Sequence, residues 1–284
     1  MDNITIAIPE NFYADNISKN VATNDEGEQI YKEPKLPKGV KIVRTTDDKC
    51  QKMLSTREAD IALLTPLSFA RLSDTSPLRI INKTCVAAED YTGVASIYFK
   101  GGVSTVESIG SSKPHSYLAV LSNMLVSELY GIDTNVESSA KSKEDIFDDH
   151  DAAIITMAGQ TDEEGLDLSE EWLQQYETPL PLYMWCVMAD QTDPKLSEII
   201  DQLTPKSLPT FTDIKSGEGT ERKGRLHFLW HEVIEKAIDN TLELLFYRQL
   251  TKAIHSVKIY NPAQEGIEGV DTIAPIELPK GGLN

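Results

Sequence analysis

The sequence has no long apolar segment. No run in it approaches the roughly 20 consecutive apolar residues that a membrane-spanning helix needs. Residues 1–5 also lack the basic start and apolar stretch of a secretory signal peptide. We therefore expect a cytoplasmic protein with no membrane partner.

Cysteine is scarce. The three cysteines, Cys50, Cys85 and Cys186, are far apart, and an odd, widely spaced set argues against both a disulfide framework and a zinc cluster. Cys85 and Cys186 stand within apolar runs. Free buried thiols are the expected state of these side chains, because a free cysteine commonly packs as a small apolar residue.

The sequence has fewer basic residues than acidic residues. There are 27 Lys and Arg against 45 Asp and Glu, so the formal net charge is −18. Nucleic acid and anionic membranes need a basic surface, which makes both poor partners for this chain. A small anionic ligand is still possible, provided that its site supplies local hydrogen-bond donors.

Familiar cofactor and metal motifs are also missing. No phosphate-binding glycine-rich loop appears, and no Ser stands between the glycines of a nucleophile elbow. His227 and His231 are four apart in a predicted helix, but Glu232 follows the second His rather than the first. His150, within the acidic residues 148–151, favours a solvated loop over a cation site. We expect neither a metal nor a cofactor.

Strand-like and helix-like segments alternate along the 284 residues, of which 40% are hydrophobic. This alternation predicts an α/β protein with parallel-rich sheets that helices cover on both faces. We predict a polar surface excursion over 15–39, no regular element over 204–224, and an extended tail over 262–284. The predicted strands are 4–8, 40–44, 59–64, 78–88, 94–99, 134–137, 152–157 and 180–188, and the predicted helices are 47–57, 65–71, 115–130, 143–147, 167–176, 193–203 and 226–257.

One ordered set of motifs resembles a known family. Residues 59–71, Ala-Asp-Ile-Ala-Leu-Leu-Thr-Pro-Leu-Ser-Phe-Ala-Arg, resemble a strand, pocket loop and helix of the chorismate dehydratases of menaquinone biosynthesis. Residues 94–99, Ser116, 151–155 and 167–172 resemble further motifs of that family and follow in its order. The resemblance covers roughly residues 1–260, and its strength lies in the ordered set rather than in any one motif.

The resemblance implies a two-lobed, periplasmic-binding-protein-like (type II) fold with a ligand cleft between the lobes. It implies one lobe from 1–91 and 190–261, and an inserted lobe from 92–189. The implied reaction is the dehydration of chorismate to 3-enolpyruvylbenzoate, the first step of the futalosine route to menaquinone. No metal or organic cofactor is implied.

Several positions of the implied pocket differ from the family pattern. The family's Tyr-Leu-Asn after the first strand is Pro9-Glu10-Asn11 here, and its Gly-Asp after a later strand is Met157-Ala158. These changes leave open an alternative, a non-catalytic protein that binds a small anionic solute on the same scaffold. A sister enzyme that acts on cyclic futalosine products is a third possibility, but its Ser-Pro-Cys-Pro-Asn-like turn is not found.

The ligand of such a site is a carboxylate, which needs several hydrogen-bond donors, ideally at helix starts. Thr65 and Ser68 begin one predicted helix, and Ser112 and Ser116 precede or begin another, so each lobe supplies a cluster. Ser96, inside a predicted strand, is a further candidate. For any of these, a helix cap or simple packing is the commoner role of a serine.

Dehydration also needs a base for the departing ring proton. Glu10 is the ionisable side chain at the end of the first predicted strand, and we predict it to be that base. Asn11, next to it, is predicted to orient the substrate or stabilise developing charge. Both positions follow a strand end, where open parallel sheets bind their ligands.

Overall fold

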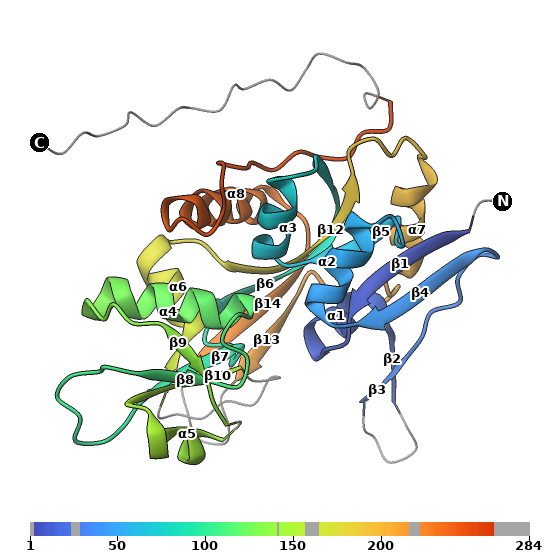
Figure 1. The fold of residues 1–284 in the computed structure, drawn as a ribbon. Coiled ribbons are helices and arrows are strands. Elements are labelled where there is room, and N and C mark those ends of the chain that lie inside the picture. The colour runs from blue at the N-terminus through green and yellow to red at the C-terminus, as the bar shows by residue number, and fades with distance from the viewer. Residues whose placement is uncertain (1–2, 24–28, 141, 157–164, 216–221, 264–284) are drawn as a thin grey trace, which may run out of the picture.

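Two β-sheets, one of seven strands and one of five, organise the part of the chain that the computed structural model describes. That part is residues 3–23, 29–140, 142–156, 165–215 and 222–263. The smaller sheet lies below the larger one in Figure 1, with helices between them. All but the first two residues of the predicted tail, 262–284, lie outside the described residues.

The larger sheet has the strand order β13-β14-β6-β12-β5-β1-β4. Strand β1 runs parallel to β4 and β5, whereas β12 runs antiparallel to β5 and β6, and β14 runs antiparallel to β6 and β13. The prediction of parallel-rich sheets is therefore wrong for this sheet, because its longest strand, β6, has only antiparallel neighbours. The strand bounds are β1 (Ile4–Pro9), β4 (Val40–Thr45), β5 (Ile61–Leu64), β6 (Leu78–Asp90), β12 (Leu180–Met188), β13 (Phe211–Lys215) and β14 (Lys223–Leu229).

The smaller sheet has the order β11-β7-β10-β8-β9. Its β8 is parallel to β9 and β10, and β7 is antiparallel to β10 and β11. A separate hairpin joins β2 to β3. These strands are β2 (Asn20–Thr23), β3 (Gln29–Lys32), β7 (Ala95–Phe99), β8 (Ile109–Ser111), β9 (Val136–Ser138), β10 (Ala152–Thr156) and β11 (Leu166–Asp167).

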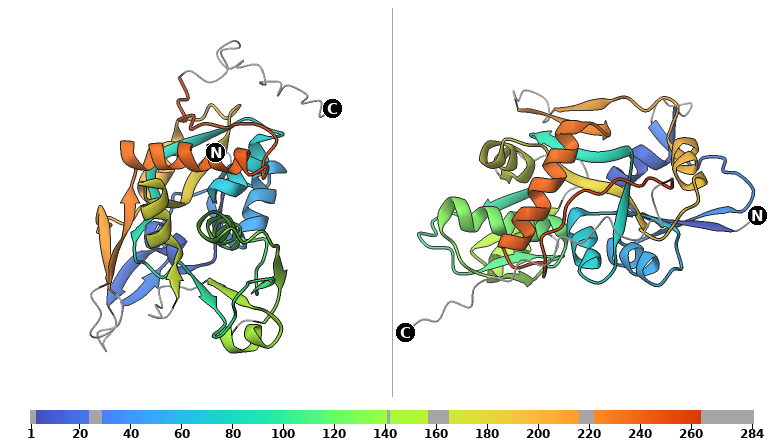
Figure 2. Two further views of the ribbon diagram at one scale, coloured as in Figure 1. Left: turned by 90° about the vertical axis from the view of Figure 1, so that its left-hand side faces the viewer. Right: turned by 90° about the horizontal axis from the view of Figure 1, so that it is seen from above.

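Helix α3 packs on both α2 and α8, and all three helices pack on the larger sheet. Helix α8 crosses over that sheet in the view from above in Figure 2. Helices α4 and α5 pack on the smaller sheet. None of the described helices is both long enough and apolar enough to span a membrane. The bounds are α1 (Phe12–Ser18), α2 (Asp47–Ser55), α3 (Pro66–Ser73), α4 (Tyr117–Tyr130), α5 (Lys143–Asp149), α6 (Leu168–Tyr176), α7 (Lys195–Leu203) and α8 (Glu232–Tyr247).

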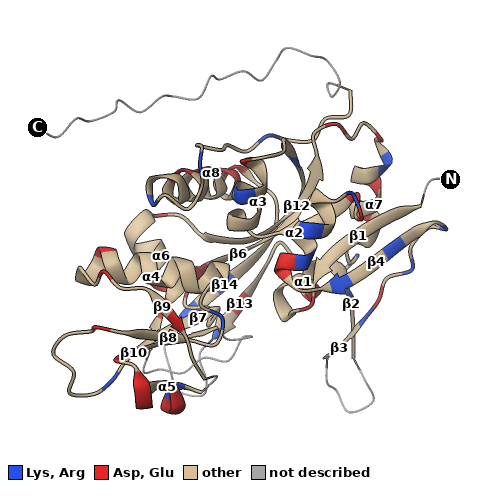
Figure 3. Ribbon diagram, in the orientation of Figure 1, with Lys and Arg blue, Asp and Glu red and all other residues tan. Residues whose placement is uncertain are grey.

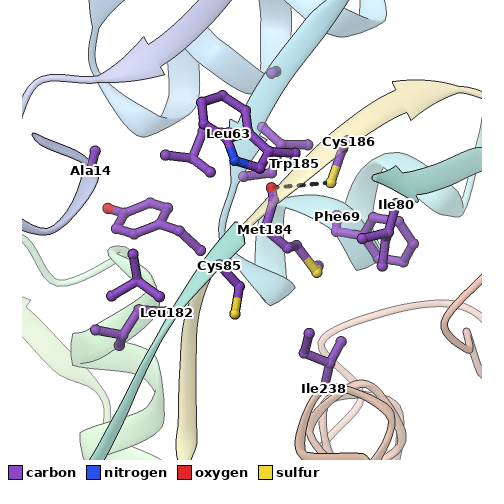
Figure 4. Packing of buried hydrophobic residues seen from close by; sticks show 14 of the residues in the cluster. Ala14, Leu63, Phe69, Ile80, Cys85, Leu182, Met184, Trp185, Cys186 and Ile238 are labelled. Carbon is purple, nitrogen blue, oxygen red and sulfur yellow. Dashed lines mark hydrogen bonds between the residues drawn. The ribbon is translucent and has the colours of Figure 1, made fainter. Parts of the chain in front are cut away.

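The main core surrounds β12, whose nine residues are all buried. Figure 4 shows Met184 and Cys186 on this strand beside Cys85 of β6, with the Cys186 Sγ 3.5 Å from the carbonyl oxygen of Met184. All three cysteines are free and buried, which confirms the prediction. The buried indole of Trp185 donates a 2.9 Å hydrogen bond to Thr84 Oγ1, so its one polar atom is satisfied within the core.

Helix α4 connects the two cores. Its Leu121 and Leu125 belong to the main core, while Ala119 and Val126 pack with strands of the smaller sheet. A helix that is apolar on two faces is expected to lie between two packed layers. The position of α4 between the sheets therefore follows from its sequence.

The predicted helix over 226–257 is wrong at both ends. Residues up to Leu229 form β14, which pairs with β6, and His231 has extended backbone angles, so α8 begins only at Glu232. The helix ends at Tyr247, and Gln249 has a left-handed φ of 58°. Leu226, Phe228 and Leu229 belong to a short, mostly apolar run, and such a run fits a buried strand as well as a buried helix segment.

Two segments predicted to be irregular contain regular elements. The surface excursion over 15–39 includes the end of α1 and the β2–β3 hairpin, and 204–224 includes β13. Helix α1 forms because Asn11 caps it and Ala14 and Ile17 bury one of its faces. The predicted lobe boundaries stay a prediction, although β12, which falls within 92–189, pairs in the larger sheet with β5 and β6.

Candidate functional site

A cavity of about 170 Å³ lies where elements of the two sheets meet. Its larger-sheet wall consists of residues that follow β1, β4 and β5 or lie on β12: Asn11, Tyr13, Asp47, Thr65, Leu182 and Tyr183. Its smaller-sheet wall consists of residues that follow β8 or end β10: Lys113, Ser116, Tyr117, Leu118 and Thr156. Residues associated with both sheets thus line the cavity.

Helix starts surround this cavity because the parallel strands β1, β4 and β5 all end at one edge of the larger sheet. Three of the lining side chains are helix caps. Asn11 Oδ1 accepts from the backbone N–H of Ala14 at 3.0 Å, and Thr65 Oγ1 accepts from that of Ser68 at 3.2 Å. Ser116 caps α4 in the same way. Each helix start carries partial positive charge and uncommitted N–H groups, which favour an anion.

A hydrogen-bonded chain of three side chains forms one side of the cavity. Asn11 Nδ2 donates to the Tyr183 hydroxyl at 2.9 Å, and that hydroxyl donates to Asp47 Oδ1 at 2.8 Å. Burial, and then the neighbouring Asp47 carboxylate, raise the pKa of Tyr183 well above its ordinary value. Tyr183 is therefore a neutral donor to Asp47 throughout the physiological range.

Asp47, the first residue of α2, supplies the carboxyl group of this hydrogen-bonded series of three side chains. Burial raises its pKa, and the neighbouring Asp48 raises it further. The Tyr183 hydrogen bond and the positive charge of Lys113 lower the same pKa and offset part of that rise. A carboxyl group in a cavity with a raised pKa and defined partners is typical of a binding or catalytic site.

Lys113 is the cation on the opposite wall. It is exposed and, among the described residues, forms no ion pair with a carboxylate. The wall that it belongs to is held in place, because the Tyr117 hydroxyl donates a 2.7 Å hydrogen bond to the carbonyl oxygen of Pro181. The cavity therefore has a negative group on one wall and a positive group on the other.

The structure brings Asn11, Thr65 and Ser116 together, three of the seven residues predicted for the site. Ser68 is buried directly behind Thr65, whose hydroxyl donates to it at 3.2 Å. It supports the cavity wall without lining it.

The other three predicted residues do not line the cavity. Glu10 is exposed beside the strand end, with its backbone N–H donating to the carbonyl oxygen of Thr45. Ser112 is exposed, and Ser96 is buried within β7, opposite Ile155 in the neighbouring strand. The strand-end rule points to the edge of the sheet beside this cavity, but it does not say which neighbouring side chain turns inward.

Three important lining residues were not predicted. Asp47 could have been found from the same rule, because it begins the helix that follows β4. Lys113 lies beside the predicted Ser112 and has the charge that an anion needs. Tyr183 had no sequence signal, since it stands within an apolar run whose strand is buried on both faces.

Neither histidine cluster forms a metal site. His227 lies on β14 and contacts Glu89 at 2.5 Å, and its ring centroid is 5.8 Å from that of His231. His150 is buried, while Asp148 lies exposed on α5, where Figure 3 shows acidic residues gathered. Among the described residues, no group of three or more His, Cys, Asp or Glu is placed to hold a metal ion.

No protein-family model and no curated protein matches this chain. Solved structures do resemble it. A structure of an ABC transporter from Parabacteroides distasonis has a TM-score of 0.54 and 12% identity, covering 92% of this chain and 99% of that one. Protein AF1704 from Archaeoglobus fulgidus has a TM-score of 0.50 and 16% identity, covering 69% and 71%.

A third structure is the CA3427 gene product of Candida albicans, described as having the generic periplasmic binding protein fold. It has a TM-score of 0.39 and 8% identity, covering 88% of this chain and 73% of that one. At such identities the first two likenesses speak for the fold alone. The expected α/β, two-lobed, periplasmic-binding-protein-like fold with a cleft between the lobes is confirmed.

Proposed function

We propose that this protein binds a small carboxylate ligand in the cavity between its lobes. The observation that carries the proposal is the convergence of capped helix starts from both lobes, at Asn11, Thr65 and Ser116, beside the cation Lys113. Backbone N–H groups and a lysine together suit a carboxylate, because each bond is charge-assisted. These local donors offset the unfavourable field of a chain with a net charge of −18.

The ligand is compact and partly apolar. The cavity volume of about 170 Å³ is below the ~300–1,000 Å³ that is usual for drug-sized ligands. Leu118, Leu182 and the ring of Tyr117 supply apolar wall between the polar groups. A single small ring that carries a carboxylate matches this combination of size, apolar contact and charge.

A second candidate function is the dehydration of chorismate to 3-enolpyruvylbenzoate. It is favoured by the ordered motifs over roughly residues 1–260 and by the Asn11–Tyr183–Asp47 chain beside the cavity. In this reaction a ring C–H bond breaks and its electron pair forms the new ring double bond. The C–O bond to the hydroxyl breaks at the same time, and the hydroxide leaves as water.

Asp47 takes the place of Glu10 as the base in this scheme. Its carboxylate accepts the ring proton, and the proton then passes to the departing hydroxide, so that Asp47 returns to its starting state. Tyr183 holds the carboxylate in position, and Asn11 in turn donates to Tyr183. The family resemblance implies no metal or organic cofactor for this reaction.

The test has two readouts. Thermal unfolding is measured with chorismate and with simple ring carboxylates, since a ligand that binds the native state raises the Tm. Product is sought by mass spectrometry after incubation with chorismate, against a blank without protein. Formation of 3-enolpyruvylbenzoate above the blank supports the lyase, and a ligand recovered unchanged supports a binding protein. If no carboxylate raises the Tm, the proposed function is wrong.

A further inference from the structure

We infer that the cavity selects its ligand by the groups at both ends of that ligand. It binds a ligand that places a carboxylate toward Lys113 and a hydrogen-bond donor, a hydroxyl or an amino group, toward Asp47. A ligand with a second carboxylate at the Asp47 end is rejected. This inference rests on the proposed function and names the class of ligand within it.

The Asp47 end requires a donor. Among the described residues, Tyr183 is the side chain that donates to the Asp47 carboxylate, at Oδ1, and the backbone N–H of Asp47 also bonds to that carboxylate. An ionised carboxylate accepts hydrogen bonds and donates none, with room for about four bonds on its two oxygens. When a ligand fills the cavity and displaces water, the remaining acceptor sites of Asp47 need a donor from that ligand.

The Lys113 end requires an acceptor. The ammonium group of Lys113 has three donors and no acceptor, and it forms no ion pair among the described residues. Ser116 and the start of α4 lie on the same wall and add partial positive charge. A ligand carboxylate is therefore most stable on this wall, which leaves the opposite end of the ligand against Asp47.

A second carboxylate at the Asp47 end would place two like charges in one cavity. Two carboxylates that share a site cannot both stay ionised without a large cost, so one of them must take up a proton. The other charged groups that act on Asp47 are Asp48, which adds to this repulsion, and Lys113, which the first ligand carboxylate already occupies. A ligand whose second carboxylate reaches Asp47 therefore binds weakly and with proton uptake.

The experiment compares rigid ligands of one shape by titration calorimetry: benzoate, 4-hydroxybenzoate and terephthalate. We expect the wild-type protein to bind 4-hydroxybenzoate at least about tenfold more tightly than terephthalate. In Asp47→Asn the preference falls to about threefold or less, mainly because terephthalate gains affinity. The matched control is Asp148→Asn, which makes the same chemical change at an exposed aspartate of α5 that does not line the cavity, and it keeps the wild-type preference.

The outcomes separate the two proposals. If terephthalate binds as tightly as benzoate and 4-hydroxybenzoate, the inferred selection at the Asp47 end is wrong and carboxylate binding stands. The same conclusion follows if Asp47→Asn keeps the full preference for 4-hydroxybenzoate over terephthalate. If none of the three ligands binds the wild-type protein, carboxylate binding and this inference both fail. The relative affinities of the three ligands for the wild-type protein test the inference even if a variant folds poorly.

Discussion

The hydroxyl of Tyr183 donates a 2.8 Å hydrogen bond to Asp47 Oδ1, although the two residues are 136 positions apart in the chain. Tyr183 comes from β12, the buried strand of the larger sheet, and Asp47 from the start of α2. The bond joins a fully buried strand of the core to the carboxyl group that, among the described residues, lines the cavity, so the position and the pKa of that carboxyl group depend on the packing of β12.

Tyr183→Phe removes the hydrogen bond that lowers the pKa of Asp47, and we expect that pKa to rise further. Asn11 also loses the acceptor of its amide group, so the free energy of unfolding falls by about 1–3 kcal/mol. Carboxyl-carbon NMR titration and urea unfolding measure the two effects. Tyr247→Phe, at a side chain that is 65% exposed, is the control. An unchanged Asp47 titration would show that the bond does not act on this pKa.

Asp47→Asn is expected to stabilise the protein at neutral pH. Because burial raises the pKa of Asp47 above 3.8, the native state binds more protons than the unfolded state as the pH rises from 3.8 through the raised pKa. Stability is therefore lost across that interval and stays lower above it. The amide cannot ionise and escapes this loss.

Urea unfolding of the wild type and Asp47→Asn, repeated from acidic to neutral pH, measures this difference. The stability gain of the variant should be smallest below pH 3.8 and should grow as the pH rises. A gain that is constant with pH would mean that ionisation of Asp47 is not its source. Asp148→Asn, at an exposed residue of α5, again serves as the matched control.

Asp167→Ala should destabilise the part of the protein around the smaller sheet. The fully buried Asp167 carboxylate accepts from the backbone N–H of Gly93 at 2.7 Å and of Ser169 at 3.0 Å, and it caps α6. Its loss leaves buried donors unpaired, and we expect a cost of about 2–4 kcal/mol in urea unfolding. Ser142→Ala, which removes the cap of α5 near the surface, should cost about 1 kcal/mol. Equal costs for the two variants would contradict this account.

Gly224→Ala tests the close approach of β14 to the loop after β6. A Cβ at Gly224 would lie 2.1 Å from the carbonyl oxygen of Tyr91, which is backbone and cannot turn away. We expect a loss of about 3 kcal/mol or failure to fold, because the strands must separate. Gly101→Ala places its Cβ where no atom lies within 4 Å and should change the thermal midpoint little. A fully stable Gly224→Ala would mean that this strand pairing differs.

Part of the site could be predicted from the sequence because it depends on local chemistry. Thr65 before Pro66, and Ser116 before an apolar run that ends at Gly131, are helix caps whose partners lie three residues away. Such short-range hydrogen bonds can be predicted from the residue types at neighbouring positions. Thr65 and Ser116 were predicted at such helix starts and do line the cavity, whereas Asn11, which also lines it, was predicted from its place after the first strand.

Long-range features could not be predicted in this way. The exposed Glu10 and the inward Asp47 are both carboxylates near strand ends, and no periodicity separates them. The apolar residues from Leu226 to Trp230 fit a helix as well as a strand, and only pairing with β6 selects the strand. Strand direction likewise depends on which neighbours complete the hydrogen bonds.

The sequence by itself therefore determined the α/β class, the capped helix starts and the apolar strands, because each depends on residues a few positions apart. Only the tertiary structure decided that Tyr183 meets Asp47 and that Lys113 stands on the wall opposite. Those contacts join residues far apart in the chain, and they exist because the packing of two sheets around α4 brings distant strand ends to one cavity.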